Sequence, residues 1–64
     1  MVKINGEQLD VAGKSVLQYL QSADYNMERI VVERNMEIVP KTEYDTTVFE
    51  DGDEIEVVSF VGGG

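Results

Sequence analysis

Apolar and polar residues alternate at the start of the chain, over residues 2–4 and again over 8–11. This period is typical of strands with one buried face. Asn5-Gly6 lies between the two runs and supplies the positive-φ pair of a type I′ turn. A hairpin with that two-residue loop places Ile4 opposite Glu7 and directs its apolar residues toward a core: Val2, Ile4, Leu9 and Val11.

A helical repeat replaces the alternation after Gly13-Lys14. Ser15, followed three residues later by Gln18, has the pattern of a capping box that opens a helix. The spacing of the next apolar residues predicts a helix over about 15–23, with Tyr19 at the core boundary. The stripe expected to pack on the hairpin consists of Val16, Leu17, Leu20 and Ala23.

Two further β-rich runs, 30–34 and 37–39, flank Asn35-Met36 and predict a second hairpin. Asn accepts a positive φ readily whereas Met does not, so the sequence leaves the turn type and the register open. Pro40 ends the second run. The connection over 42–47 is expected to be irregular or a single turn, with Val48 or Phe49 anchoring it to the core.

Asp51-Gly52-Asp53 predicts a turn into a last strand, in which Ile55 and Val57 alternate with charged residues. Because Glu56 is costly to bury, its face should be the outer one. Val58 and Phe60 have the same parity as Glu56 and then lie on the open face as partner-binding candidates. Val61 is a further candidate, and Val31 or Ile38 would extend the surface. The alternative is that a bulge turns Phe60 under the sheet edge.

The chain ends in Gly62-Gly63-Gly64, which has no side chains to add to a core. We expect a domain over 1–61 and a flexible arm over 62–64, able to carry the terminal carboxylate roughly 10 Å into a partner's cleft. That carboxylate is a poor electrophile, so acyl chemistry on Gly64 needs activation. The sequence has no phosphate-binding loop motif, Cys or His, so a partner must supply it. A frayed end or a cloning remnant is the alternative.

Sixty-four residues form one small domain with no room for a buried catalytic cavity. Five basic against thirteen acidic residues give a net charge of −8, which argues against nucleic acid and anionic membranes and favours a basic protein partner. Zero Cys is compatible with a cytoplasmic location, and no signal peptide or membrane span is predicted. The acidic residues of 50–54 are more typical of a solvated turn than of a calcium site.

The element order predicts an α+β roll, a mixed sheet of about five strands with one helix across one face. Several segments, in this order, resemble the ubiquitin-like β-grasp sulfur carriers, and among them the family of thiamine biosynthesis. They are Asn5-Gly6, Ser15-Val16, the run from Asn35 to Lys41, Asp51-Gly52-Asp53 and Gly63-Gly64. The resemblance places the first and last strands side by side in the middle of the sheet. Two departures are Met36, where many members have Gly, and the additional Gly62.

The resemblance implies a carrier and cosubstrate, not an enzyme. In that family an adenylating enzyme uses ATP and magnesium to adenylate the terminal carboxylate, here that of Gly64. Sulfur from a cysteine desulfurase gives a thiocarboxylate, which thiazole synthase consumes. No cofactor is expected on the carrier itself, and Gly62 and Gly63 would thread the tail. Alternatives are the small subunit of molybdopterin synthase, a protein modifier that forms an isopeptide bond, and an inert β-grasp interaction domain.

Overall fold

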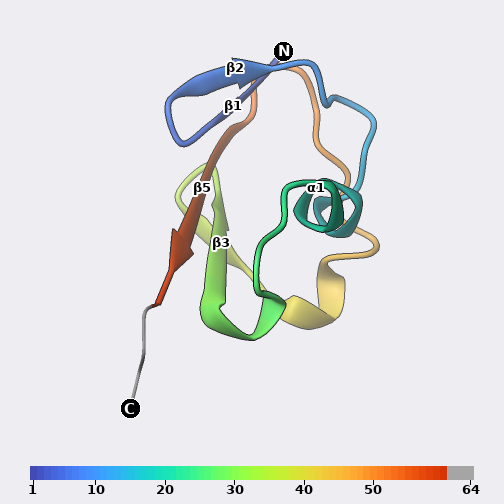
Figure 1. Cartoon of the computed structure of the whole chain (residues 1–64). Helices are drawn as coiled ribbons and strands as arrows, with labels where there is room; N and C mark the ends of the chain where they lie inside the picture. The colour runs from blue at the N-terminus through green and yellow to red at the C-terminus, as the bar shows by residue number, and fades with distance from the viewer. Residues whose placement is uncertain (61–64) are drawn as a thin grey trace.

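The computed structural model describes residues 1–60, which form five strands, one α-helix and two short 3-10 turns (Figure 1). The strands are β1 (Val2–Ile4), β2 (Glu7–Leu9), β3 (Ile30–Arg34), β4 (Glu37–Val39) and β5 (Glu54–Ser59). The helix α1 spans Val16–Ser22, and the 3-10 turns span Met27–Arg29 and Lys41–Glu43. The predicted partner-binding residue Val61 and the glycines 62–64 lie outside the described residues.

The strands form one mixed sheet in the order β2-β1-β5-β3-β4, with α1 on one side of it (Figure 1). β5 runs parallel to β1 and antiparallel to β3. The predicted α+β roll is therefore confirmed, as is the pairing of the first strand with the last. The last strand lies at the centre of the sheet, between the two hairpins.

The first hairpin has the predicted register, with Val2 opposite Leu9 and Ile4 opposite Glu7. Its second strand ends at Leu9 rather than continuing to Val11, which is half-buried. The second hairpin also has a two-residue turn, because Arg34 pairs with Glu37. Both Asn35 and Met36 have a positive φ, as a type I′ turn requires.

The capping box at the start of α1 is formed as predicted. Ser15 Oγ accepts a hydrogen bond from the Gln18 amide at 3.1 Å, and Gln18 Oε1 accepts one from the Ser15 amide at 2.8 Å. Val16 and Leu20 are fully buried against the sheet. Ala23 was expected in this stripe and is instead exposed, because the helix ends at Ser22 and the chain turns away at Asp24, where φ is +61°.

The segment from Pro40 to Asp53 covers the N-terminal end of α1. The Val16 and Leu17 amides, which have no partner within the helix, donate to the carbonyls of Thr47 at 2.9 Å and Tyr44 at 2.8 Å. Phe49 is the anchor to the core, with 1% of its surface exposed, whereas Val48 is 45% exposed. Tyr44 is also buried and was not predicted, because it stands in an irregular stretch with no periodicity.

Candidate functional site

β5 leads directly to the glycine tail, and its backbone is held from both sides. On one side, the Asn5 amide donates to the Ile55 carbonyl at 2.9 Å. The Asn5 side chain continues the ladder, since Oδ1 accepts from the Val57 amide at 2.8 Å. On the other side, the Asn35 amide donates to the Glu54 carbonyl, and Asn35 Oδ1 accepts from the Glu54 amide at 2.9 Å. The first residue of each hairpin turn therefore fixes the strand that carries the tail.

The far end of β5 is held by β3. Val57 pairs with Val32 and Val58 with Val31, and one further backbone hydrogen bond joins the Phe60 amide to the Arg29 carbonyl at 2.7 Å. Pairing thus continues one residue beyond Ser59, where β5 ends. The position of Phe60 is therefore defined by the sheet.

Burial along β5 alternates as the sequence predicts. Ile55 and Val57 are buried beneath α1, whereas Val58 is 46% and Phe60 53% exposed on the opposite face. The alternative, that Phe60 turns under the sheet edge, is excluded by this exposure. Both predicted partner-binding residues that the structure describes are available on the open face of the sheet.

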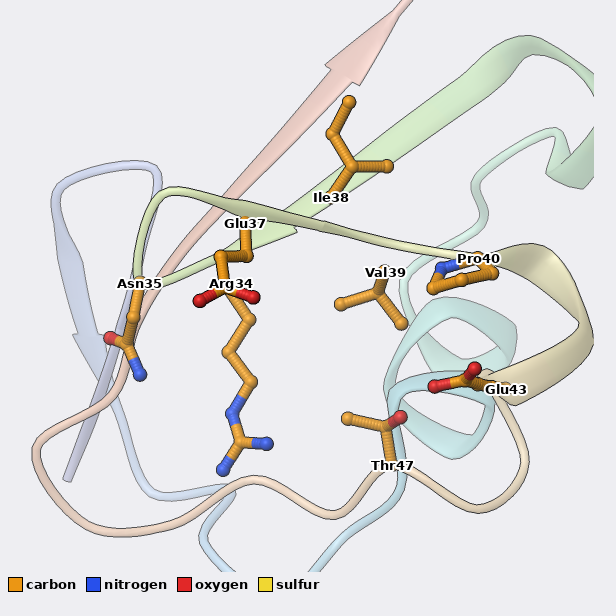
Figure 2. Close-up of a pocket in the computed structure, with 8 residues that line it drawn as sticks. All are labelled: Arg34, Asn35, Glu37, Ile38, Val39, Pro40, Glu43 and Thr47. Atoms are coloured by element: carbon orange, nitrogen blue, oxygen red, sulfur yellow. The ribbon is translucent and has the colours of Figure 1, made fainter.

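Two further apolar residues lie on this open face. Val31 is directly opposite Val58 and is half-buried. Ile38 is 67% exposed, and Figure 2 shows it on the opposite side of its strand from Val39 and Arg34. We refer to the four residues as the apolar patch: Val31, Ile38, Val58 and Phe60.

Three acidic residues continue the open face toward the tip of the second hairpin. Glu33 and Glu56 are directly opposite each other in the register, and Glu54 follows on the same face of β5. Glu33, Glu54 and Glu56 form no salt bridge with any residue of the described part of the chain. We call these three the acidic strip. With Asn35 and Met36, they line a depression in the surface.

A second hollow lies beneath β4, and Figure 2 shows Arg34 extending into it from the second hairpin. The guanidinium is already bound, since Nε donates to Asp53 at 2.9 Å and an Nη donates to Glu50 at 2.9 Å. Asp53 also accepts from Asn35 Nδ2 at 3.1 Å and from the Glu50 amide at 2.8 Å. The side chains beside this hollow therefore form a structural hydrogen-bond network that connects the 50–53 turn to the second hairpin.

The expectation of a solvated acidic turn over 50–54 is wrong for Asp53, which is only 7% exposed. Burial alone raises the pKa of Asp53, but its hydrogen bonds from Glu50, Asn35 and Arg34 and the charge of Arg34 outweigh burial and lower the pKa below the ordinary 3.8. Sequence reasoning missed this role because the Arg34 partner is distant in the chain. Within residues 1–60, no group of three or more acidic side chains is arranged to hold a metal ion.

The fold and the site together define a class of protein. A mixed five-stranded sheet in this order, with one helix across it and the last strand at its centre, is the ubiquitin-like β-grasp fold. The family model of the ThiS family matches residues 2–64. The chain therefore belongs to the ThiS family, which confirms the resemblance found in the sequence. Among residues 1–60, no helix has the length and apolar character needed to cross a bilayer.

Known proteins similar to this chain agree with that assignment. The sulfur carrier protein ThiS of Bacillus subtilis is 41% identical over 68 aligned positions, which cover the whole of both chains. A crystal structure of the thiamine biosynthesis protein ThiS from Geobacter metallireducens superimposes with a TM-score of 0.78 at 31% identity, covering 98% of this chain and 97% of that one.

A thiazole synthase of Paramagnetospirillum magneticum is 42% identical over 62 residues, which are 95% of this chain. The chain spans only 19% of the length of that relative. A segment similar to this domain therefore occurs within a much longer thiazole synthase polypeptide.

Proposed function

We propose that this ThiS-family chain is a sulfur carrier whose Gly64 carboxylate is adenylated and then converted to a thiocarboxylate that donates sulfur for thiazole formation. A carboxylate oxygen attacks the α-phosphorus of ATP and releases pyrophosphate, which gives an acyl-adenylate. The terminal sulfur of a desulfurase persulfide then displaces AMP at the acyl carbon, which gives an acyl disulfide between carrier and desulfurase. A thiol reductant cleaves its S–S bond, which releases the thiocarboxylate and returns the desulfurase cysteine as a thiol, while the reductant is oxidised to a disulfide. The carrier is a cosubstrate in this scheme, while the partner enzyme binds ATP and magnesium.

Family membership is the single observation that carries the proposal. The relative named as a sulfur carrier aligns over the whole of both chains, including the glycine tail that the chemistry requires. Thiazole synthase is favoured as a partner because thiazole synthases contain segments similar to this chain. The adenylating enzyme, the cysteine desulfurase and the cytoplasmic location follow from the family resemblance.

The apolar patch is the proposed docking surface for partner enzymes. It lies on the open face of the sheet, next to the point where β5 continues into the tail. Aromatic and aliphatic side chains that the core does not use can contribute to binding when a partner covers them. Acids at its border favour a partner with a basic surround.

Sulfur loading tests the chemistry directly. The carrier is incubated with ATP, magnesium, the adenylating enzyme, the desulfurase, cysteine and a thiol reductant, and its intact mass is measured. We expect sulfur to replace one oxygen in the wild type, and no loading after deletion of Gly64 or in Gly63→Val, whose Cβ branch obstructs the threaded backbone. The exposed helix variant Gln21→Ala is the control and should load normally. Undiminished loading of either tail variant contradicts the proposal, and an isopeptide product would instead indicate a protein modifier.

A matched pair of substitutions tests the docking surface. Val58 is 46% exposed in the apolar patch and Val48 is 45% exposed beside α1. Val58→Ser and Phe60→Ser should each weaken binding of the adenylating enzyme by about tenfold, because they remove apolar area from the interface. Val48→Ser should leave binding unchanged. Calorimetry measures the affinity of the wild type and of the three variants for the enzyme. Equal affinities for all four proteins would place the docking surface elsewhere.

A further inference from the structure

Met36 occupies a backbone conformation that favours glycine. It is the second residue of the β3–β4 turn, with φ at +71°, where an L side chain crowds its own carbonyl. Its side chain is 94% exposed, so it adds almost nothing to the core. The equivalent residue of the first hairpin is Gly6, with φ at +84°. A residue that costs stability and contributes no packing suggests a contact outside the domain.

The position of Met36 shows which surface such a contact would use. Met36 lines the depression together with the whole acidic strip. Glu33 and Glu56 lie opposite each other in the next positions of the sheet, and Val31 and Val58 lie beyond them. The open face therefore presents the apolar patch, with Ile38 opposite Glu33, and Met36 on either side of carboxylates that form no salt bridge within residues 1–60.

We propose that Met36 is a docking residue that extends the binding surface for the adenylating enzyme to the tip of the second hairpin. The complementary partner surface presents an arginine or lysine between two apolar contact areas. One area covers the apolar patch, and the other covers Met36. This inference rests on the proposed function, because it assumes an enzyme that receives the tail.

Charge favours the adenylating enzyme as the occupant. A site that binds ATP holds the triphosphate with cationic groups, so its surroundings are positive. The carrier has a net charge of −8, and the carboxylates of Glu33, Glu54 and Glu56 have no salt-bridge partner within residues 1–60. Docking of this face neutralises the strip and also brings the end of β5 toward the enzyme.

Two substitutions at Met36 separate its effect on stability from its effect on binding. Met36→Gly relieves the backbone crowding, so its Tm should rise by about 3 °C. Its KM as a substrate of the adenylating enzyme should nevertheless rise about fivefold, with kcat unchanged, since the contact is remote from the reacting carboxylate. Met36→Gln keeps the backbone strain but removes the apolar contact. It should therefore show the same rise in KM with an unchanged Tm.

Gly13→Met is the control for an added exposed methionine and for altered stability. Gly13 has φ at +92° and lies before α1, where a Cβ has open space. This variant should have a lower Tm and an unchanged KM. The readouts are pyrophosphate release against carrier concentration and thermal unfolding by circular dichroism.

Three results would overturn the assignment. An unchanged KM for both Met36 variants removes Met36 from the interface. A loss of affinity only toward thiazole synthase, or self-association that the variants abolish in sedimentation experiments, assigns Met36 to another occupant. Failure of the proposed function is distinguishable, because the wild type itself would then release no pyrophosphate, or would release it without gaining sulfur in the intact-mass assay.

Discussion

The two hairpins use the same turn but meet different demands. Each begins its two-residue turn with an asparagine at φ +51°, and each asparagine bonds to the backbone of β5. The first hairpin places Gly6 second and relieves the strain, whereas the second places an exposed Met36 there. The second hairpin is also fastened by the buried Asp53 network. A hairpin can thus retain a locally unfavourable residue when other contacts hold it.

The largest expected effect comes from removing the Asp53 hydrogen-bond network that holds the second hairpin. Asp53→Ala leaves Arg34 and Asn35 without their buried acceptor, so we expect a loss of about 2–4 kcal/mol in the free energy of unfolding. Urea denaturation measures it. The exposed Asp51→Ala is the control and should cost much less. A loss below about 0.5 kcal/mol, within the range of ordinary surface substitutions, would show that the network is dispensable.

Part of the contribution of Asp53 to the free energy of unfolding depends on pH. The folded-state pKa of Asp53 is lowered, so its charge-dependent stabilisation is present above the unfolded-state pKa near 3.8 and is lost as pH falls through the folded-state value. Below pH 3.8 the wild type should therefore lose stability more steeply than Asp53→Asn. The difference in slope isolates Asp53, because the other acids titrate in both proteins. Parallel curves would contradict a lowered pKa.

The turn of the first hairpin offers the reverse of the Met36 experiment. Gly6→Met places a side chain at a positive φ in the first hairpin, as Met36 does in the second. The space for a Cβ is open at this position. The cost should be about 1 kcal/mol from the positive φ alone. Urea denaturation of Gly6→Met beside Met36→Gly should give changes of opposite sign. Changes of the same sign would show that strain is not what distinguishes the two turns.

The smallest expected effects come from two glutamates of β5 whose neighbours on the adjacent strands carry opposite charges. Glu54 lies opposite Lys3 of the first hairpin, and Glu56 lies opposite Glu33 of the second. Glu56→Gln should stabilise the fold by about 0.2–0.5 kcal/mol because it removes a like-charged neighbour, while Glu54→Gln should destabilise it by a similar amount. Both differences should shrink in 1 M salt. Insensitivity to salt would indicate packing rather than charge as the cause.

Sequence reasoning was most successful where the signal is local. The turn Asn5-Gly6, the capping box of Ser15 and Gln18, and the alternation along β5 all depend on neighbouring residues, and each is present in the structure. The outward orientation of Val58 and Phe60 followed from the same alternation. Their role in binding, with the roles of Val61 and the three glycines, stays a prediction.

The sequence by itself determined the elements, the parity of β5 and the family, because periodicity, turn chemistry and the order of motifs are properties of the chain. Tertiary structure alone decided that Ala23 is exposed, that Tyr44 is buried and that Asp53 is a structural acceptor rather than a solvated acid. It also decided that Met36 adopts a positive φ. The burial of Tyr44 and the role of Asp53 depend on contacts between segments that are distant in sequence, such as Arg34 with Asp53, and pairing of β3 with β4 holds Met36 in a conformation that its local preference disfavours.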